Sequence, residues 1–208
     1  MSPWPNVPHE LEQRLRRSTC TPAQVEHYLD GLSATTRLAA LAALSPRGQA
    51  ELFACAAGHR DRTLDDLVPG REAGATATHQ GANTLPVASR FAKRFCRPAT
   101  PERSDVLYGY NHMSTWLTRA LGPGAFVASA VPGAHGLSEI FIDYRAAVPW
   151  LPAGWPRPRR NDVGLAKLAF GGLGDCLRGV SADVSVGRAS RDGRWMDSWF
   201  VLCRVDGA

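Results

Sequence analysis

The chain has 208 residues, of which 44% are hydrophobic, and it carries a formal net charge of +5. This length suffices for one domain with a substantial core, or for a small helical module beside a larger domain, and the composition excludes a chain disordered throughout. No stretch approaches the roughly eighteen consecutive apolar residues of a membrane span, and the N-terminus has no basic region followed by an apolar run. We therefore expect a soluble, cytoplasmic protein with no membrane partner.

The five cysteines are widely separated and include no Cys-x-x-Cys pair. They are Cys20, Cys55, Cys96, Cys176 and Cys203. This spacing predicts reduced, mostly buried thiols and is unlike a disulfide framework or a zinc site. It supports a cytoplasmic setting, and we expect neither a metal nor a cofactor.

Residues 1–66 are predicted to form a helical region, because N-capping residues precede several short apolar patterns. Thr21 is followed directly by proline and three residues later by glutamine, which predicts a capping box with proline at the first helical position. Ser33 and Ser45 are predicted to cap two further helices. Residues 10–17 form an amphipathic segment that predicts a fourth helix.

Residues 67–85 are rich in Gly, Ala and Thr, and we predict a loop or linker there. Residues 86–208 contain extended segments separated by turn signals, which predict an antiparallel β-domain. The predicted strands are 87–97, 106–112, 125–131, 137–144, 179–188 and 195–205. Residues 162–177 fit neither a helix nor a strand clearly.

The clearest strand signal is the strict alternation of apolar and small polar residues from Val180 to Val186. Asp192-Gly193 lies between two alternating runs and predicts a tight hairpin, so the last two strands are expected to be antiparallel neighbours. The proline-rich segment 150–160 is expected to lie across the sheet or over one mouth of a barrel. The fold class that follows is α+β, with short N-terminal helices before a curved antiparallel sheet or a small β-barrel.

Two adjacent cations on a predicted strand are the first candidates for ligand binding. In segment 91–97, Lys93 shares a face with two phenylalanines, and Arg94 lies on the other face beside an alanine and a cysteine. Whichever face is buried carries a cation among apolar neighbours, which is costly unless an acid or an anionic ligand pairs with it. The alternative is a surface cation whose stem lies along an outer face.

A cluster of polar and aromatic residues lies on the next predicted strand. Alternation sends Tyr108, Tyr110 and His112 to one side of it. A histidine with two tyrosines can orient a ligand or supply general acid or base chemistry, whereas a metal site needs further ligands that stand at no recognisable spacing. We take Tyr110 and His112 as candidate catalytic residues, and Tyr108 and Asn111 as candidate ligand-binding residues. The alternative for His112 is a structural role.

Asp143 is the third candidate catalytic residue, and it shares a predicted strand face with Glu139. If the interior of a barrel is polar, Asp143 and Asp183 would meet Lys93 or Arg94 there. Such paired charges would hold a general acid or base at a useful pKa. The alternative is that these acids are solvated on an outer face.

Familiar catalytic motifs are missing from the sequence. It has no P-loop, no dinucleotide-binding glycine fingerprint, no Gly-x-Ser-x-Gly elbow and no His-Glu-x-x-His. Arg157, Arg159 and Arg160 lie near Trp150 and Trp155, a combination that can neutralise phosphates and stack bases. The alternative is a solvated surface loop.

Several short motifs together resemble those of a group of uncharacterised bacterial proteins. They are Asn83-x-Leu85-Pro86, Lys93-Arg94-Phe95-Cys96-Arg97-Pro98, Gly109-Tyr110-Asn111, Gly122-Pro123-Gly124-x-Phe126-Val127, Asp143-Tyr144, Gly154-Trp155-Pro156 and Val180-Ser181. The resemblance covers most of the chain from about residue 45 onward. It implies a bacterial source and transfers no activity and no site residue.

Three functions are compatible with the sequence. The leading hypothesis is a β-domain that binds a small apolar or aromatic molecule with a polar or acidic group, and such a cavity can also accelerate a cyclisation or an isomerisation without a cofactor. The alternative is a non-catalytic interaction module in which the helices or an open sheet edge dock another protein chain. Nucleic-acid binding is the third hypothesis. Whether the protein is an enzyme stays open.

Overall fold

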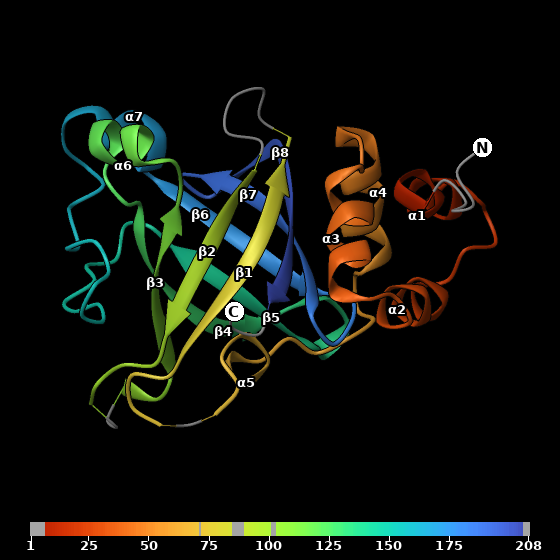
Figure 1. The fold of residues 1–208 in the computed structure, drawn as a ribbon, viewed down its shortest axis with the longest axis horizontal. Helices are drawn as coiled ribbons and strands as arrows, with labels where there is room; N and C mark the ends of the chain where they lie inside the picture. Colours follow the sequence, from red (N-terminus) through yellow and green to blue (C-terminus); the bar gives the residue numbers. More distant parts are fainter. Residues whose placement is uncertain (1–6, 71, 85–89, 101–102, 206–208) are drawn as a thin grey trace.

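A closed antiparallel β-barrel with helices packed against its outside is the architecture of the chain (Figure 1). The structure, a computed structural model, describes residues 7–70, 72–84, 90–100 and 103–205. Each strand pairs with its neighbours in the sequence, and β1 also pairs with β8, which closes the barrel. The predicted α+β fold with an antiparallel barrel is therefore confirmed.

The barrel strands follow one another around the barrel in sequence order. They are β1 (Thr76–Asn83), β2 (Arg90–Cys96), β3 (Val106–His112), β4 (Ala125–Pro132), β5 (Ser138–Asp143), β6 (Leu173–Gly179), β7 (Val184–Arg191) and β8 (Arg194–Val205). The predicted hairpin at Asp192-Gly193 is confirmed, because it joins β7 to β8 and both residues have a positive φ. This is the backbone twist that a tight hairpin requires.

The helices are short and most of them precede the barrel. They are α1 (Val7–Leu15), α2 (Pro22–Asp30), α3 (Ala34–Ala42), α4 (Pro46–Cys55), α5 (Leu64–Leu67), α6 (Thr115–Leu121) and α7 (Gly164–Phe170), with a 3₁₀ turn at Ala134–Gly136. The predicted caps are confirmed. Thr21 forms the capping box of α2, and Ser33 and Ser45 accept hydrogen bonds from the first turns of α3 and α4.

One core lies between the N-terminal helices and the outer face of β1, β7 and β8. Leu29, Leu41 and Leu52 of the helices pack there with Val184 and Val201 of the barrel. The strand predicted from residue 179 begins only at Val184, since residues 180–183 form the turn between β6 and β7. The alternation in residues 180–186 therefore continues from a turn into a strand. Its three valines pack in the core under the helices, whereas Ala182 is exposed.

The prediction of a loop at residues 67–85 is wrong for residues 76–83, which form β1. The inner face of this strand is crowded at Gly81. A Cβ atom at Gly81 would lie 2.8 Å from both a methyl group of Leu202 and the carbonyl oxygen of Val201. A small residue is therefore needed at this position, although strands usually favour larger, β-branched residues. This is why the composition of the segment does not predict a strand.

A second core fills much of the barrel interior with side chains such as Phe95, Phe126, Ile142 and Leu202. Helix α5 closes one end of the barrel, while α6 and α7 lie together at the other end (Figure 1). The proline-rich segment 150–160 packs on the outer face of β2 and β3. It thus lies across the sheet, which is one of the two predicted positions, and not over a mouth of the barrel.

Gly109 faces the interior, and we predict that Gly109→Ala destabilises the barrel. An added Cβ would lie 2.5 Å from the ring of Phe126 and 2.4 Å from the carbonyl oxygen of Arg94. Overpacking of this kind costs about 1–3 kcal/mol. Urea denaturation should show a lower midpoint with an unchanged m-value. Gly31→Ala is the control, because its Cβ would meet only ordinary contacts, starting at 3.4 Å; an equal loss in both variants would contradict the prediction.

His79 makes the stability depend on pH. Its Nε2 lies 2.8 Å from the carbonyl oxygen of Leu67 and its ring packs edge-on against Phe95. Burial lowers the pKa of His79 to about 4, whereas an unfolded histidine titrates near about 6.5. Between these values only the unfolded chain binds the proton, so the free energy of unfolding falls as the pH falls, by about 3 kcal/mol in total.

The measurement for His79 is urea denaturation at pH 7 and pH 4 of the wild type and of His79→Gln. We expect the wild type to lose about 3 kcal/mol more than the variant over this range. Other groups titrate in both proteins and cancel in the difference. Equal losses in the two proteins would show that His79 does not carry this pH dependence.

Candidate functional site

The barrel interior is hollow at the end that carries α6 and α7. A cavity of about 420 Å³ lies there, bounded by side chains of the barrel wall and by the two helices. Its lining is mostly apolar and includes Phe91, Phe170, Phe200, Leu117 and Leu121. Among its polar side chains, four lie together: Lys93, Asn111 and Asp175 on strands, and Tyr144 directly after β5.

These four side chains form one hydrogen-bond network around the ammonium group of Lys93. Its Nζ donates to Oδ1 of Asn111 at 2.9 Å, to Oδ2 of Asp175 at 3.0 Å and to the hydroxyl of Tyr144. An ammonium group has three N–H donors, so all of them have a partner. The side chains of Lys93 and Asp175 are only 3% and 5% exposed, which makes this a buried ion pair.

The strand register explains why the network forms at this level of the barrel. Lys93 of β2 and Asn111 of β3 are direct partners across the ladder, so their side chains point inward side by side. Asp175 on β6 lies across from Ile142 on β5, and Tyr144 directly follows β5 on the same face as Ile142. Residues far apart in the sequence are thus brought to one inner surface.

Aromatic rings surround the same ammonium group. The Nζ of Lys93 lies between 5.0 and 5.6 Å from the ring centres of Phe91, Phe126, Tyr144 and Phe200. Such contacts stabilise a cation, but the rings also exclude water from around it. Burial lowers the pKa of Lys93, although Asp175 opposes the change.

Tyr144 completes the network as a group that can donate a proton. Its hydroxyl lies 3.1 Å from Oδ2 of Asp175, and it accepts a hydrogen bond from Nδ2 of Asn111 at 3.1 Å. Burial, together with the charge of Asp175, raises the pKa of Tyr144 well above its usual value. The phenol therefore stays protonated at neutral pH.

The helical cover of the cavity is fixed to the barrel by Arg191 of β7. Its guanidinium donates to the carbonyl oxygens of Leu168 and Ala169, both at 3.2 Å, at the C-terminal end of α7. Trp116 on α6 and Leu165 on α7 are exposed, and so is Leu168, which also lines the cavity.

Of the predicted ligand-binding residues, Lys93 and Asn111 lie in this cavity. Arg94 and Tyr110 lie on the outer face of the barrel, where Arg94 donates to the hydroxyl of Tyr110 at 3.4 Å and covers the ring of Trp155 at 5.3 Å. The reason is the strand period of two, which sends Arg94 away from the interior once Lys93 points inward.

The remaining residues of the predicted site also lie outside the cavity. Tyr108 belongs to the outer cluster that the proline-rich segment covers, and His112 is exposed with Nδ1 3.4 Å from the hydroxyl of Tyr110. Asp143 accepts two hydrogen bonds from the guanidinium of Arg145, at 2.9 and 3.0 Å. The structure therefore does not bring Tyr110, His112 and Asp143 together inside the barrel.

Asp183 lies beneath the N-terminal helices rather than near Lys93. It forms ion pairs with Arg37 of α3, at 2.7 Å, and with Arg204 of β8, at 2.5 Å. The expected meeting of Asp143 and Asp183 with Lys93 or Arg94 is not found. The acid that pairs with Lys93 is Asp175.

Sequence reasoning missed two members of the network, Asp175 and Tyr144. Asp175 lies in the segment that fitted neither a helix nor a strand clearly. Its signal is the alternation of Leu173, Asp175 and Leu177, which places one acid between two leucines on the inner face of β6. Tyr144 shows a similar signal, because it lies two residues after Ile142 and therefore points to the same inner face.

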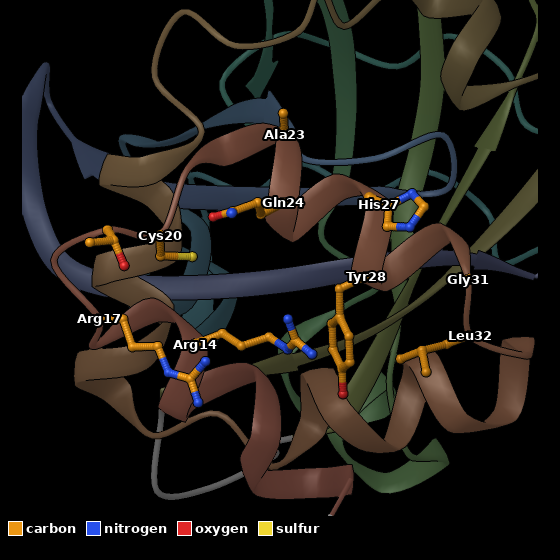
Figure 2. A pocket seen from close by; sticks show the side chains of 10 residues that line it. Arg14, Arg17, Cys20, Ala23, Gln24, His27, Tyr28, Gly31 and Leu32 are labelled. Atoms are coloured by element: carbon orange, nitrogen blue, oxygen red, sulfur yellow. The ribbon is translucent and has the colours of Figure 1, made fainter.

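A larger surface hollow, of about 620 Å³, lies at α1 and α2, and Figure 2 shows the side chains around it. Arg14 there lies over the ring of Tyr28 and forms an ion pair with Glu10. Arg17 and His27 are exposed to solvent. Its cations are therefore either paired or solvated, and the barrel cavity is the better candidate site.

No protein-family model, curated protein or solved structure matches this chain. Among the residues that the structure describes, no helix combines the length and apolar character needed to cross a bilayer. Within the same residues, no three His, Cys, Asp or Glu side chains are grouped as metal ligands would be.

The buried ion pair leads to a prediction about stability. Lys93→Met or Asp175→Asn alone leaves one buried charge without its partner and should cost about 3–5 kcal/mol. The double variant removes both charges, so its cost should be smaller than the sum of the single costs by more than about 1 kcal/mol. Urea denaturation of the four proteins measures this difference. Additive costs would contradict a coupled pair.

Proposed function

We propose that this protein binds one small, mainly apolar or aromatic molecule inside its barrel. The observation that carries the proposal is the cavity of about 420 Å³ under α6 and α7. This volume lies within the range of roughly 300–1,000 Å³ that is typical of small-molecule sites. Mostly apolar walls and a few converging polar groups are also typical of such sites.

The polar network indicates which group of the ligand would face it. Asp175 already neutralises the charge of Lys93, so this ammonium group does not demand an anionic ligand. Arg191, the other cation of the lining, donates to backbone carbonyl oxygens of α7. Lys93, Asn111 and Tyr144 nevertheless present N–H and O–H donors. A carbonyl or hydroxyl oxygen on an otherwise apolar molecule suits this arrangement.

The other functions considered from the sequence gain less support. Docking at an open sheet edge has no basis, because β1 and β8 pair and close the barrel. Base stacking on Trp155 is disfavoured, because its ring already packs against Tyr110 and Arg94. Cyclase or isomerase chemistry by Tyr110, His112 and Asp143 is not part of the proposal, since these residues lie outside the cavity.

A titration with the apolar fluorescent probe N-phenyl-1-naphthylamine tests the proposal. We expect saturable binding of one probe molecule per chain. Ala189→Phe, which places a ring in the cavity, should weaken binding at least about tenfold. Ala120→Phe on the exposed side of α6 is the matched control and should bind normally.

Native mass spectrometry of the same samples gives an independent readout of stoichiometry. Circular dichroism of both variants checks that they are folded. Absence of saturable binding to the folded wild type, or equal binding by Ala189→Phe, would show that the cavity is not a binding site.

A further inference from the structure

We propose that Lys93 binds its ligand covalently, by forming an imine between Nζ and the carbonyl carbon of an apolar aldehyde or ketone in the barrel cavity. This inference rests on the proposed function and names the chemical class of the ligand. It assigns roles to Lys93, Asp175 and Tyr144, which touch one another at the reacting nitrogen.

The first requirement is an amine that can lose its proton. Asp175 accepts a hydrogen bond from Nζ at 3.0 Å and is therefore placed to take that proton. The transfer converts a buried ion pair into two neutral groups, which an apolar interior tolerates better than separated charges. Desolvation in an apolar pocket is one of the ways in which proteins activate a lysine as a nucleophile.

The second requirement is a proton for the oxygen that leaves. The neutral amine attacks the carbonyl carbon, and the carbonyl oxygen takes up a proton to give a carbinolamine. That hydroxyl then leaves as water with a second proton, and the nitrogen lone pair forms the C=N bond. The hydroxyl of Tyr144 and the protonated carboxyl of Asp175 supply these two protons. The nitrogen loses one proton when the carbinolamine forms, and one of these two side chains takes it up.

In total, a carbonyl compound and a lysine ammonium give a protonated imine and one water molecule. No bond is oxidised or reduced, so no further reactant is needed. Asn111 is a positioning residue, because its amide donates to the hydroxyl of Tyr144 and its oxygen accepts from Nζ. The reacting nitrogen is thus held from two sides.

The third requirement is protection of the imine from water. Phe91, Phe126 and Phe200 surround Nζ at 5.0 to 5.6 Å, and side chains of α6 and α7 line one side of the cavity. Lys93 is itself buried, and exclusion of water from its nitrogen slows hydrolysis of a reactive intermediate. The same rings would contact an apolar ligand attached to the nitrogen.

The composition of the chain adds an independent argument. Lys93 and Lys167 are the only lysines, and every other one of the 24 basic residues is arginine. An arginine can also form a buried ion pair, but its guanidinium does not deprotonate in proteins. Of lysine and arginine, only lysine can become a nucleophile, and one of the two lysines lies at the cavity.

Reductive trapping tests the proposal, and Lys167 serves as the internal control. The folded protein is incubated at pH 7 with a panel of aryl and alkyl aldehydes, including 6-methoxy-2-naphthaldehyde, and with sodium cyanoborohydride. Intact-mass analysis and peptide mapping then locate the adduct. Lys167 is exposed on α7 whereas Lys93 is buried, so access alone would favour Lys167.

We expect one adduct per chain, at Lys93, formed at least about tenfold faster than at Lys167. Lys167→Arg should retain the adduct, and Lys93→Arg should lose it. Circular dichroism checks that Lys93→Arg is folded. If Lys93→Arg fails to fold, retention of the adduct by Lys167→Arg still supports modification at Lys93.

Alcohols with the same carbon skeletons separate the covalent step from the binding step. If an aldehyde and its alcohol both displace N-phenyl-1-naphthylamine but Lys93 stays unmodified, the imine is wrong and the binding function stands. Failure of every aldehyde to displace the probe, or modification of Lys167 alone, also overturns the imine. A protein that never binds the probe overturns the binding function and the imine together.

Discussion

An ammonium group held inside a closed barrel is the constraint on which the rest of the structure depends. Burying one charge is costly, so Lys93 requires Asp175 from a distant strand and donates further hydrogen bonds to Asn111 and Tyr144. Only a barrel whose register is fixed all the way round brings these side chains to one level. Much of the interior architecture can be understood as support for this single group.

The glycines of the inner face show how that support is built. Gly109 leaves room for the ring of Phe126, and a Cβ atom at Gly187 would lie 2.2 Å from the ring of Phe200. Both rings belong to the set that surrounds Lys93. One glycine on β3 and one on β7 thus leave room for large rings on the neighbouring strands to extend into the barrel interior.

Local signals predicted the N-terminal helices and the last hairpin well, because caps and turn residues act over three or four positions, but they did not predict α6 or α7. They failed at β1, where tertiary crowding at Gly81 overrides the usual composition of strands. For the site, the sequence identified Lys93 but left open which face of its strand was buried. Its partner Asp175 lies 82 positions away, and barrel closure alone determines that meeting.

The helical cover has a consequence for how fast a ligand exchanges. Helices α6 and α7 have seven residues each, a length at which a helix in isolation is unstable in water. Their place over the cavity depends on tertiary contacts such as the hydrogen bonds from Arg191 to the end of α7. For the proposed ligand, we therefore expect local opening of these two helices to influence the residence time.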